Sequence, residues 1–310
     1  MIKIGIVGFG NLGKAVLNVF KDCPKVKIVA IFSKHILASE ICGVPVFNPS
    51  LALRFKNKID LMVLCTGSQN SMLHDAPFFA EHFNIINSFD THSKIKSELN
   101  KLNNICKQAN TFSIIACGWD PGVFSLFRAY FSLFCQHFAV FYGKGVSLGH
   151  TNAVKHIKGV SDAISFTMPN NKALMLAKKG NNLQTNLLRR EVFIAPATKT
   201  KAIKQKVLNM PHYFKGENTT IHFVSQEKLN ALKTLAHKGE IIASNNFLSS
   251  ETYTLKFKTT SNPMATAKIM LAFCLKIKEL KLKYGTGAFT PLNFAPADLI
   301  NQKNIFKGIV

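Results

Sequence analysis

Three glycines near the start of the chain have the spacing of a phosphate-binding turn. The stretch KIGIVGFGNLG places Gly8, Gly10 and Gly13 in the pattern G-x-G-x-x-G, directly after a short apolar run. In this pattern the first glycine permits a tight turn, the second lets the backbone approach a pyrophosphate, and the third lets a helix pack closely on a strand. Free N–H groups at the start of that helix can bind the phosphates. The motif predicts a dinucleotide site, with a ligand-free glycine turn as the alternative.

The end of the second apolar run indicates which dinucleotide fits. An acidic residue about twenty positions after the glycines would bind the ribose 2′-hydroxyl of NAD. Here VKIVAIF ends in Ser33, Lys34 and His35, with no acid. A hydroxyl and a cation suit a 2′-phosphate, so we expect NADP; the alternative is that Lys34 is an ordinary surface lysine. The candidate cofactor-binding residues lie on the glycine turn and after the apolar runs that follow it: Gly8, Gly10, Asn11, Leu12, Gly13, Ser33, Lys34, His35, Cys65, Gly67 and Ser68.

The only tryptophan of the chain stands beside an aspartate, in ACGWDPG. Trp119 and Asp120 follow the apolar run 113–116, and in open α/β sheets ligands bind at the carboxyl ends of such strands. Asp90, in NSFDTHS, follows the preceding run and brings a second carboxylate to the same edge. Two carboxylates beside an indole can hold the ammonium group of an amino acid. The alternatives are a helix N-cap for Asp90, a turn residue for Asp120 and a core residue for Trp119.

Regular elements must hold these residues in place. Apolar runs alternate with helical patterns in the first third of the chain, which predicts a parallel sheet with crossover helices, as in a Rossmann-type α/β domain. The expected strands are 3–7, 27–32, 61–64, 84–87 and 113–116, and the expected helices are 12–21, 71–83 and 91–109, the last with Asp90 or Thr91 as N-cap.

The pattern changes after about residue 120. The runs REVFIA, TTIHFVS and TYTLKFKTT alternate apolar and polar residues, as in an antiparallel sheet with one covered face. A helix over 263–281 follows, and the tail GTGAFTPLNFAPADLI is expected to return to the first domain. We therefore expect a dinucleotide-binding domain over 1–118, completed by about 263–310, and an α+β domain with a mixed or antiparallel sheet over 119–262.

Composition and charge restrict the class of protein. Lysine and arginine outnumber aspartate and glutamate by 39 to 16, and the net charge of +23 would favour polyanions, yet the basic residues are spread along the chain. The seven cysteines form no C-x-x-C pair, which favours a reducing cytoplasm and predicts no metal site. The first strand begins at Ile2, so no signal peptide is expected. The apolar stretch 123–141 contains Arg128, Gln136 and His137, which predicts a buried helix running into a strand and no membrane span.

Together with the glycines, the stretches FDTH, CGWDPG, GVSLGH and GTGAFTPLNFAPADL resemble the meso-diaminopimelate dehydrogenase family. The resemblance runs from the first strand to the last helix. It implies an NADP-dependent cytoplasmic enzyme and a homodimer, built from a dinucleotide-binding domain, a dimerisation region and a substrate domain. The implied reaction deaminates the D-centre of meso-2,6-diaminopimelate to L-2-amino-6-oxopimelate and ammonia; its reverse lies on the route to lysine and peptidoglycan.

The resemblance also assigns roles to residues. Asp90 and Asp120 would be the catalytic pair at the D-centre amine, and the segment GVSLGH would cover the D-carboxylate with backbone N–H groups. Thr167, Arg190 and His237 would hold the L-carboxylate, for which a bidentate arginine and two neutral donors are suited. The implied substrate-binding residues are Trp119, Tyr142, Leu148, Gly149, Thr167, Arg190, His237 and Asn262, the last reading the L-amine.

Three positions depart from the family pattern. Tyr142 stands where the family usually has Trp, Leu148 where it has Gln, and Asn152 where it has Asp. We expect these changes to affect the affinity for the substrate and the identity of the substrate, and to leave the type of reaction unchanged. The alternatives are an NADP-dependent dehydrogenase of another diamino or D-amino acid, a reductase of a semialdehyde or dipicolinate-like substrate, and a redox-sensing dinucleotide protein that binds nucleic acid. No helix-turn-helix or aromatic RNA-binding signature is present, so we expect neither a nucleic-acid nor a membrane partner.

Overall fold

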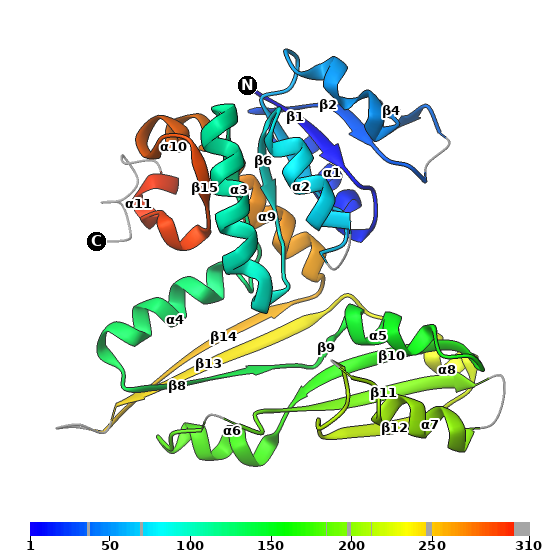
Figure 1. Cartoon of the computed structure of the whole chain (residues 1–310). Helices are drawn as coiled ribbons and strands as arrows, with labels where there is room; N and C mark the ends of the chain where they lie inside the picture. Colours follow the sequence, from blue (N-terminus) through cyan, green and yellow to red (C-terminus); the bar gives the residue numbers. More distant parts are fainter. Residues whose placement is uncertain are drawn as a thin grey trace. The chain divides into compact units, whose positions relative to one another are not determined.

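The computed structural model describes residues 1–35, 38–68, 71–183, 185–196, 200–211, 213–245 and 250–300. The chain divides into two compact units, Met1–Phe127 with Pro263–Val310, and Arg128–Asn262 (Figure 1). The sequence predicts the first boundary after residue 118, whereas the contacts place it after Phe127. The cause lies in the turn after Gly118: the N–H groups of Val123 and Phe124 donate to the carbonyls of Gly118 and Trp119, so the first turn of the next helix stays with the first unit.

An eight-stranded sheet organises the first unit, in the order β15-β7-β6-β5-β1-β2-β4-β3. Every neighbouring pair is parallel except β3 and β4, a hairpin whose turn residues Cys42 and Gly43 both have positive φ. The strands are β1 (Ile2–Val7), β2 (Val26–Phe32), β3 (Glu40–Ile41), β4 (Val44–Phe47), β5 (Leu61–Leu64), β6 (Asn84–Asn87), β7 (Phe112–Ile114) and β15 (Gly287–Phe289). All five predicted strands are present, although the last one, predicted over 113–116, ends at Ile114, and β15 from the tail pairs with β7.

Helices cover both faces of this sheet (Figure 1). One core packs α1 and α9–α10 against the sheet, and a second core packs α2 and α3 against the other face. The helices are α1 (Asn11–Lys21), α2 (Ser71–Ala80), α3 (Ile95–Ala109), α9 (Asn262–Cys274), α10 (Ile277–Tyr284) and α11 (Pro296–Leu299), with 3-10 turns at Pro49–Phe55, His92–Lys94 and Pro291–Asn293. This arrangement is the doubly wound α/β architecture that the sequence predicts.

Two predicted helices differ from those observed. The helix predicted over 263–281 is two helices, because the N–H of Lys276 bonds to Phe273 three residues back and tightens the turn between them. The apolar positions keep their helical spacing across this break, so the sequence gives no sign of it. The helix predicted from 91 starts as a 3-10 turn, and α3 begins at Ile95; Thr91 precedes that turn without a side-chain cap bond.

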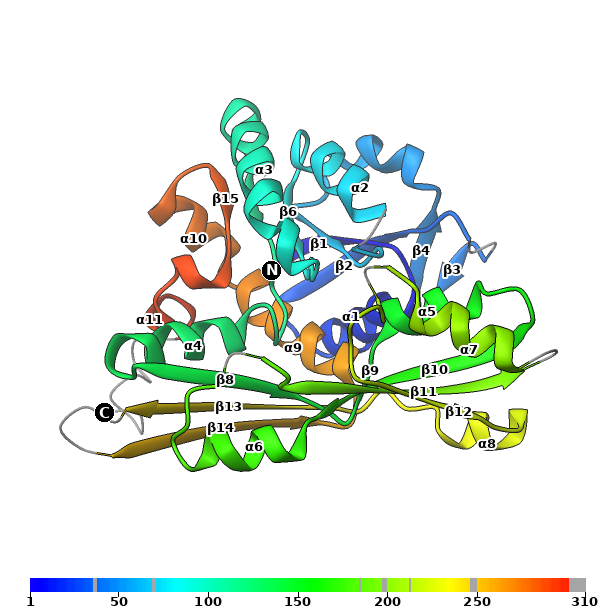
Figure 2. The ribbon, with the colours of Figure 1, turned by 60° about the horizontal axis from the view of Figure 1, so that its bottom comes forward.

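The second unit contains two sheets with helices packed on them (Figure 2). The four-stranded sheet runs β12-β11-β10-β9 and is mixed, since β12 is parallel to β11; the three-stranded sheet runs β14-β13-β8 and is antiparallel. The strands are β8 (His137–Tyr142), β9 (Gly145–Val146), β10 (Val160–Pro169), β11 (Leu188–Pro196), β12 (Thr219–Phe223), β13 (His237–Asn245) and β14 (Glu251–Thr259). Helices α5 (Leu148–Lys155) and α7 (Thr200–Leu208) pack on one face of the larger sheet, α8 (Gln226–Ala231) packs on the other, and α6 (Asn171–Lys178) covers the smaller sheet.

The helix α4 (Val123–Phe134) corrects one expectation. The sequence predicts a buried helix, but along α4 only Phe124 is buried, and Leu133 is 79 % exposed. The stretch does run on into the strand β8, as predicted. Within the described ranges, none of the helices combines the length and the apolar character that crossing a membrane requires.

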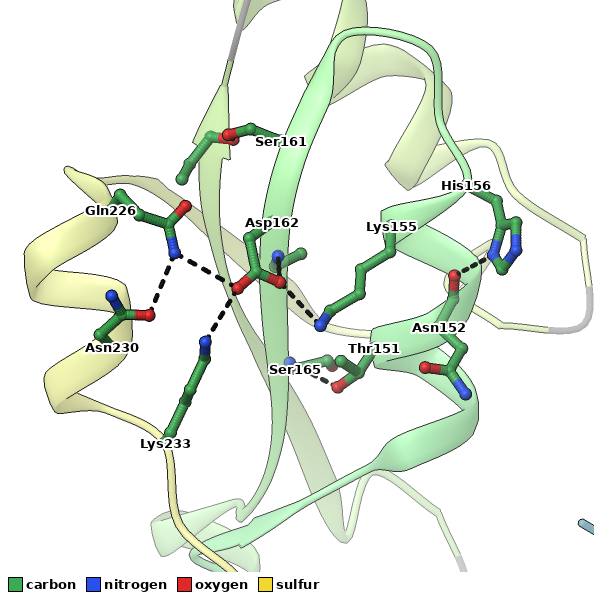
Figure 3. Close-up of polar contacts among 12 residues, drawn as sticks. Thr151, Asn152, Lys155, His156, Ser161, Asp162, Ser165, Gln226, Asn230 and Lys233 are labelled. Carbon is green, nitrogen blue, oxygen red and sulfur yellow. Dashed lines mark hydrogen bonds and ion pairs between the residues drawn. The ribbon is translucent and has the colours of Figure 1, made fainter. Parts of the chain in front are cut away.

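A partly buried carboxylate joins three elements of the second unit (Figure 3). Asp162 on β10 accepts hydrogen bonds from Lys155 of α5 at 2.7 Å, from Lys233 just after α8 at 3.2 Å, and from Gln226 of α8 at 3.3 Å. The N–H of Ala163 also donates to it. Burial by itself would raise the pKa of Asp162, but these four donors together hold its pKa well below the ordinary value.

Candidate functional site

The glycine turn after β1 has the geometry that its spacing predicts. Gly8 has φ +86°, and a Cβ there would lie 2.8 Å from a side-chain carbon of Thr66. A Cβ on Gly13 would lie 2.2 Å from the carbonyl oxygen of Gly8, so α1 can approach the turn only with glycine at this position. At Gly10 a Cβ would meet nothing within 4 Å. Packing therefore does not require glycine at position 10, where the backbone is open to an approaching group.

A cavity of about 700 Å³ opens beside this turn, at the carboxyl ends of β1, β2 and β5. Seven of the eleven predicted cofactor residues line it: Gly8, Gly10, Ser33, Lys34, His35, Cys65 and Gly67. Asn11, Leu12, Gly13 and Ser68 do not line it. The other lining residues were not predicted from the sequence: Val7, Phe9, Phe32, Pro49, Thr66, Ser71, His74 and Asp75. Thr66 could have been predicted, because it closely follows a predicted strand. His74 and Asp75 lie inside α2, where no residue spacing in the sequence distinguishes them.

Polar groups of this cavity suit a phosphorylated ligand. The first turn of α1 holds no acidic residue, and no side chain caps its N-terminus. At the end of β2 the hydroxyl of Ser33 accepts a hydrogen bond from the N–H of His35 at 3.4 Å, while Lys34 and His35 are exposed at the rim. Asp75 is the carboxylate among the described lining residues, and it comes from α2 rather than from the end of β2.

Asp90 lies in the loop after β6 and is exposed. Its N–H donates to the hydroxyl of Ser68 at 3.3 Å, which joins the loops that follow β5 and β6. The N–H of Phe89 donates to the side-chain oxygen of buried Asn87 at 3.1 Å. Ser68 thus supports the loop of Asp90 instead of lining the nucleotide cavity.

The loop GWDPG after β7 is tightly folded. Trp119 is 5 % exposed and meets Phe124 edge to face at 5.0 Å, so its indole is buried. The Asp120–Pro121 peptide is cis, and Asp120 is half-buried. Gly122 has φ +134°, and a Cβ there would lie 1.9 Å from the carbonyl oxygen of Gly118. Only glycine fits at position 122, and the loop holds Asp120 at the same sheet edge as Asp90.

Thr167 and Arg190 come together in the second unit. They are register partners on β10 and β11, and the guanidinium Nη1 of Arg190 donates to the Thr167 hydroxyl. The Arg190 side chain is only 13 % exposed and also pairs with Glu217, which the sequence analysis did not single out. Its neighbour Arg189 points to the opposite face of β11, where it pairs with Glu191. Of these two adjacent arginines, Arg190 is therefore the enclosed one.

His237 joins this group through the backbone of β9. A Cβ on Gly145 would lie 2.3 Å from the ring of His237, and Gly145 is itself the register partner of Thr167. Tyr142, at the end of β8, pairs with Gly239 on the strand that His237 begins. Tyr142 and His237 thus lie on neighbouring strands of the three-stranded sheet, and Thr167 and Arg190 on neighbouring strands of the four-stranded sheet of the same unit.

Leu148, Gly149 and Asn262 start helices. The segment GVSLGH, expected as a covering loop, forms β9 and the first turn of α5, and Leu148 there is 56 % exposed. Asn262 begins α9, and its N–H donates to the carbonyl of Leu235 at 2.8 Å. Asn152 is exposed on α5. No group of three or more His, Cys, Asp or Glu side chains among the described residues is arranged to hold a metal ion.

His150 of α5 is enclosed near Arg190. Its ring nitrogens lie 2.8 Å from the Ser147 hydroxyl and 2.9 Å from the carbonyl oxygen of Tyr213. Burial, followed by the positive charge of Arg190, lowers the pKa of His150. A neutral ring that donates from Nε2 to the carbonyl and accepts at Nδ1 from Ser147 satisfies both contacts. His150 therefore anchors the segment that leads to Glu217.

The doubly wound sheet, the glycine turn and its cavity define a dinucleotide-binding protein of the Rossmann class. Residues 118–262 match the family model described as diaminopimelic acid dehydrogenase C-terminal domain. The meso-diaminopimelate D-dehydrogenase of Acetivibrio thermocellus is 34 % identical to the chain, over 96 % of the chain and 94 % of the relative. The chain belongs to the meso-diaminopimelate dehydrogenase family.

Solved structures agree with this assignment. The diaminopimelate dehydrogenase of Corynebacterium glutamicum in complex with DAP has a TM-score of 0.91 and 28 % identity, covering 100 % of this chain and 99 % of that one. An engineered D-amino acid dehydrogenase bound to NADP+ has a TM-score of 0.88 and 28 % identity, with the same coverage. The match therefore extends over both units and is not confined to the nucleotide-binding fold.

Proposed function

We propose that this protein is an NADP-dependent oxidoreductase that reversibly deaminates the D-centre of meso-2,6-diaminopimelate. The products are L-2-amino-6-oxopimelate and ammonia, and the reverse reaction supplies a precursor of lysine and peptidoglycan. The observation that carries the proposal is the enclosed pair of Arg190 and Thr167 on adjacent strands. A guanidinium beside a hydroxyl is a carboxylate-binding arrangement, and a diaminopimelate has a second carboxylate for it to bind.

The first unit provides groups for the cofactor. The open backbone at Gly10, the uncapped start of α1 and the cavity beside them fit a pyrophosphate. Ser33 and Lys34 at the end of β2 fit a 2′-phosphate better than a free ribose hydroxyl, which favours NADP. When bound, NADP+ would supply the acceptor for the hydride that leaves the substrate.

Asp90 and Asp120 are proposed to act on the reacting amine. Both follow neighbouring strands at one edge of the parallel sheet, where their carboxylates can hold an ammonium group and orient the adjacent Cα–H. Trp119 precedes Asp120 in the same loop, and its buried contact with Phe124 helps to keep that loop fixed. After oxidation, water releases ammonia from the substrate imine.

The second unit is proposed to bind the L-centre. Arg190, Thr167 and His237 hold its carboxylate, and Asn262 reads its amine. Tyr142, Leu148 and Gly149 complete the substrate contacts that the family resemblance implies. Leu148 presents an apolar, exposed side chain where the family usually has an amide, so it cannot supply the hydrogen bonds of a glutamine.

We also propose a cytoplasmic homodimer. The helix α4 and the strand β14 together expose aromatic side chains: Phe134 meets Tyr253 at 5.4 Å and Phe131 meets it at 6.1 Å. Tyr130, Leu133 and Phe138 extend this apolar surface. Contiguous exposed apolar surface of this kind is typical of protein interfaces.

The test is NADPH formation by the purified protein with NADP+ and, in parallel, the meso, LL and DD isomers of 2,6-diaminopimelate. Turnover of the meso isomer alone is the expected result. Turnover of D-lysine in preference to meso-diaminopimelate would assign the protein to another diamino or D-amino acid. No NADPH formation with any of these substrates would contradict the proposed reaction.

A further inference from the structure

The guanidinium of Arg190 already has two protein partners. Its Nε donates to Oε2 of Glu217 at 2.5 Å, and its Nη2 lies 3.5 Å from Oε1 of the same carboxylate. On the other side, Nη1 donates to the hydroxyl of Thr167. Glu217 therefore approaches one edge of the guanidinium with both oxygens, while Thr167 bonds to the far nitrogen.

These contacts leave donors available for a ligand. A guanidinium has five N–H groups, and three of them face Glu217 and Thr167 in the described part of the chain. One N–H remains on each of the two terminal nitrogens, and the two oxygens of an incoming carboxylate can accept from both. The hydroxyl of Thr167 accepts from Arg190, so its own hydrogen can be donated to the same ligand.

The backbone around Glu217 is firmly held. The N–H of Glu217 donates to the carbonyl of buried Phe214 at 3.0 Å, which closes a turn. His150 fixes the start of this turn through the carbonyl of Tyr213 at 2.9 Å. Directly after the turn, the carbonyl of Asn218 accepts from the backbone N–H of Arg190 at 2.7 Å. The carboxylate is thus presented from the segment that pairs with the backbone of Arg190.

We propose that Glu217 is a positioning residue of the distal carboxylate site. It holds one edge of the Arg190 guanidinium so that the remaining N–H groups face the carboxylate at the L-centre of the substrate. An arginine side chain has several rotatable bonds, so fixing it before binding lowers the entropy lost when the substrate binds. This inference rests on the proposed function, because it takes the distal carboxylate of the substrate as the ligand.

Steady-state kinetics of Glu217→Ala and Glu217→Gln test the proposal. Glu217→Ala should raise the KM for meso-diaminopimelate by about tenfold, with kcat within about twofold and the KM for NADP+ unchanged. Glu217→Gln should recover much of the loss, because its amide oxygen can still accept from Nε. Glu191→Gln is the matched control: it removes a carboxylate paired with Arg189 on the opposite face of the same strand, and it should leave all three constants unchanged.

An unchanged KM in Glu217→Ala would overturn the proposal. A lower KM would also overturn it, since it would mean that Glu217 competes with the substrate for Arg190. Absence of turnover by the wild-type protein is a different result and would contradict the proposed function itself.

A spectroscopic measurement tests the contact without turnover. In the free wild-type protein the side-chain Nε–H of Arg190, assigned by its loss in Arg190→Lys, should give a slowly exchanging ¹⁵N–¹H signal. Glu217→Ala should abolish that signal and Glu217→Gln should retain it. A fast-exchanging Nε–H in the wild-type protein would show that Glu217 does not hold the guanidinium.

Discussion

Arg190 and Arg189 are adjacent in sequence and differ entirely in environment. Strand alternation directs Arg190 toward Thr167 and Glu217, and Arg189 toward Glu191. A lysine at position 190 would keep the charge but lose the planar set of donors that a carboxylate accepts from. Arg190→Lys should therefore raise the KM for meso-diaminopimelate by about 10- to 100-fold, equivalent to about 1.4–2.8 kcal/mol.

Arg189→Lys provides the control for this prediction, because it makes the same chemical change on the opposite face of β11. It should leave the KM for both substrates near the wild-type values. Equal effects of the two substitutions would mean that the strand as a whole was perturbed, and the carboxylate role of Arg190 would be lost.

Lys34 tests the choice of dinucleotide. It lines the nucleotide cavity after β2, where no acid is present to bind a 2′-hydroxyl. Lys34→Ala should raise the KM for NADP+ by about tenfold, because a charge-assisted contact to the 2′-phosphate is lost, and should change the KM for NAD+ little. Lys25→Ala removes an exposed lysine just before β2, at the end of that strand away from the cavity, and should change neither KM. Equal losses with both dinucleotides would contradict the assigned role.

At the level of secondary structure, Asp162 joins α5, β10 and α8, because three side chains from these segments converge on it (Figure 3). Asp162→Asn should reduce the free energy of unfolding at neutral pH by about 1–3 kcal/mol, since the hydrogen bonds to an ionised group are weakened. Chemical denaturation of the wild-type and variant proteins measures this difference.

The same group predicts a pH dependence with a defined sign. The folded protein holds the pKa of Asp162 below its ordinary value, so the unfolded chain binds the proton more readily. The stabilisation is complete above the ordinary pKa of about 4 and is lost as the pH falls below it. The difference in the free energy of unfolding between the wild-type protein and Asp162→Asn should therefore become smaller as the pH falls from 5 toward 2. A difference that does not change with pH would show that Asp162 stabilises the fold through packing alone.

The elements that sequence could predict are those whose signal is local. The continuous apolar run LMVL predicts a strand covered on both faces, and all four residues of β5 are buried. The glycine spacing predicts the close packing at Gly13, because the atom that excludes a side chain there is the carbonyl oxygen of Gly8, five residues earlier. The break between α9 and α10 carries no such signal, since Phe273 and Ile277 keep the helical period across it.

The candidate site shows the same division. Asp90 and Asp120 could be found because each follows a predicted strand of a parallel sheet, where ligand sites occur. Arg190 and His237 were found only through resemblance to a family. Glu217 was not predicted, because its contact with Arg190 depends on how the turn after Phe214 packs beside β11. No residue spacing in the sequence indicates that arrangement.

At the scale of the whole molecule, the apolar surface of α4 and β14 explains a failed expectation. The sequence of α4 is as apolar as a core helix, yet Leu133 and Phe134 are exposed in the single chain. Hydrophobic pattern indicates that a surface avoids water and does not distinguish burial within a chain from burial between chains. The two possibilities predict different oligomeric states, so they can be separated by experiment.

If a second copy covers this surface, Leu133→Asp should convert a dimer to a monomer. In a two-fold interface each residue occurs twice, so two buried leucines are lost, at a cost of about 3–6 kcal/mol before the cost of burying the new charges. Sedimentation velocity at micromolar concentration should show a dimer for the wild-type protein and a monomer for the variant. Leu282→Asp replaces a leucine that is 89 % exposed on α10, and it should remain dimeric.

Each outcome of this experiment has a distinct meaning. A monomeric wild-type protein would contradict the homodimer, and α4 would then expose its apolar residues to solvent or to a different protein. If the dimer persists in Leu133→Asp but dissociates in Leu282→Asp, the interface lies on the first unit and not on the surface of α4 and β14. Loss of NADPH formation in a monomeric Leu133→Asp, with the fold intact by circular dichroism, would add that the active enzyme requires the dimer, since Leu133 lies on none of the strands that carry the substrate-binding residues.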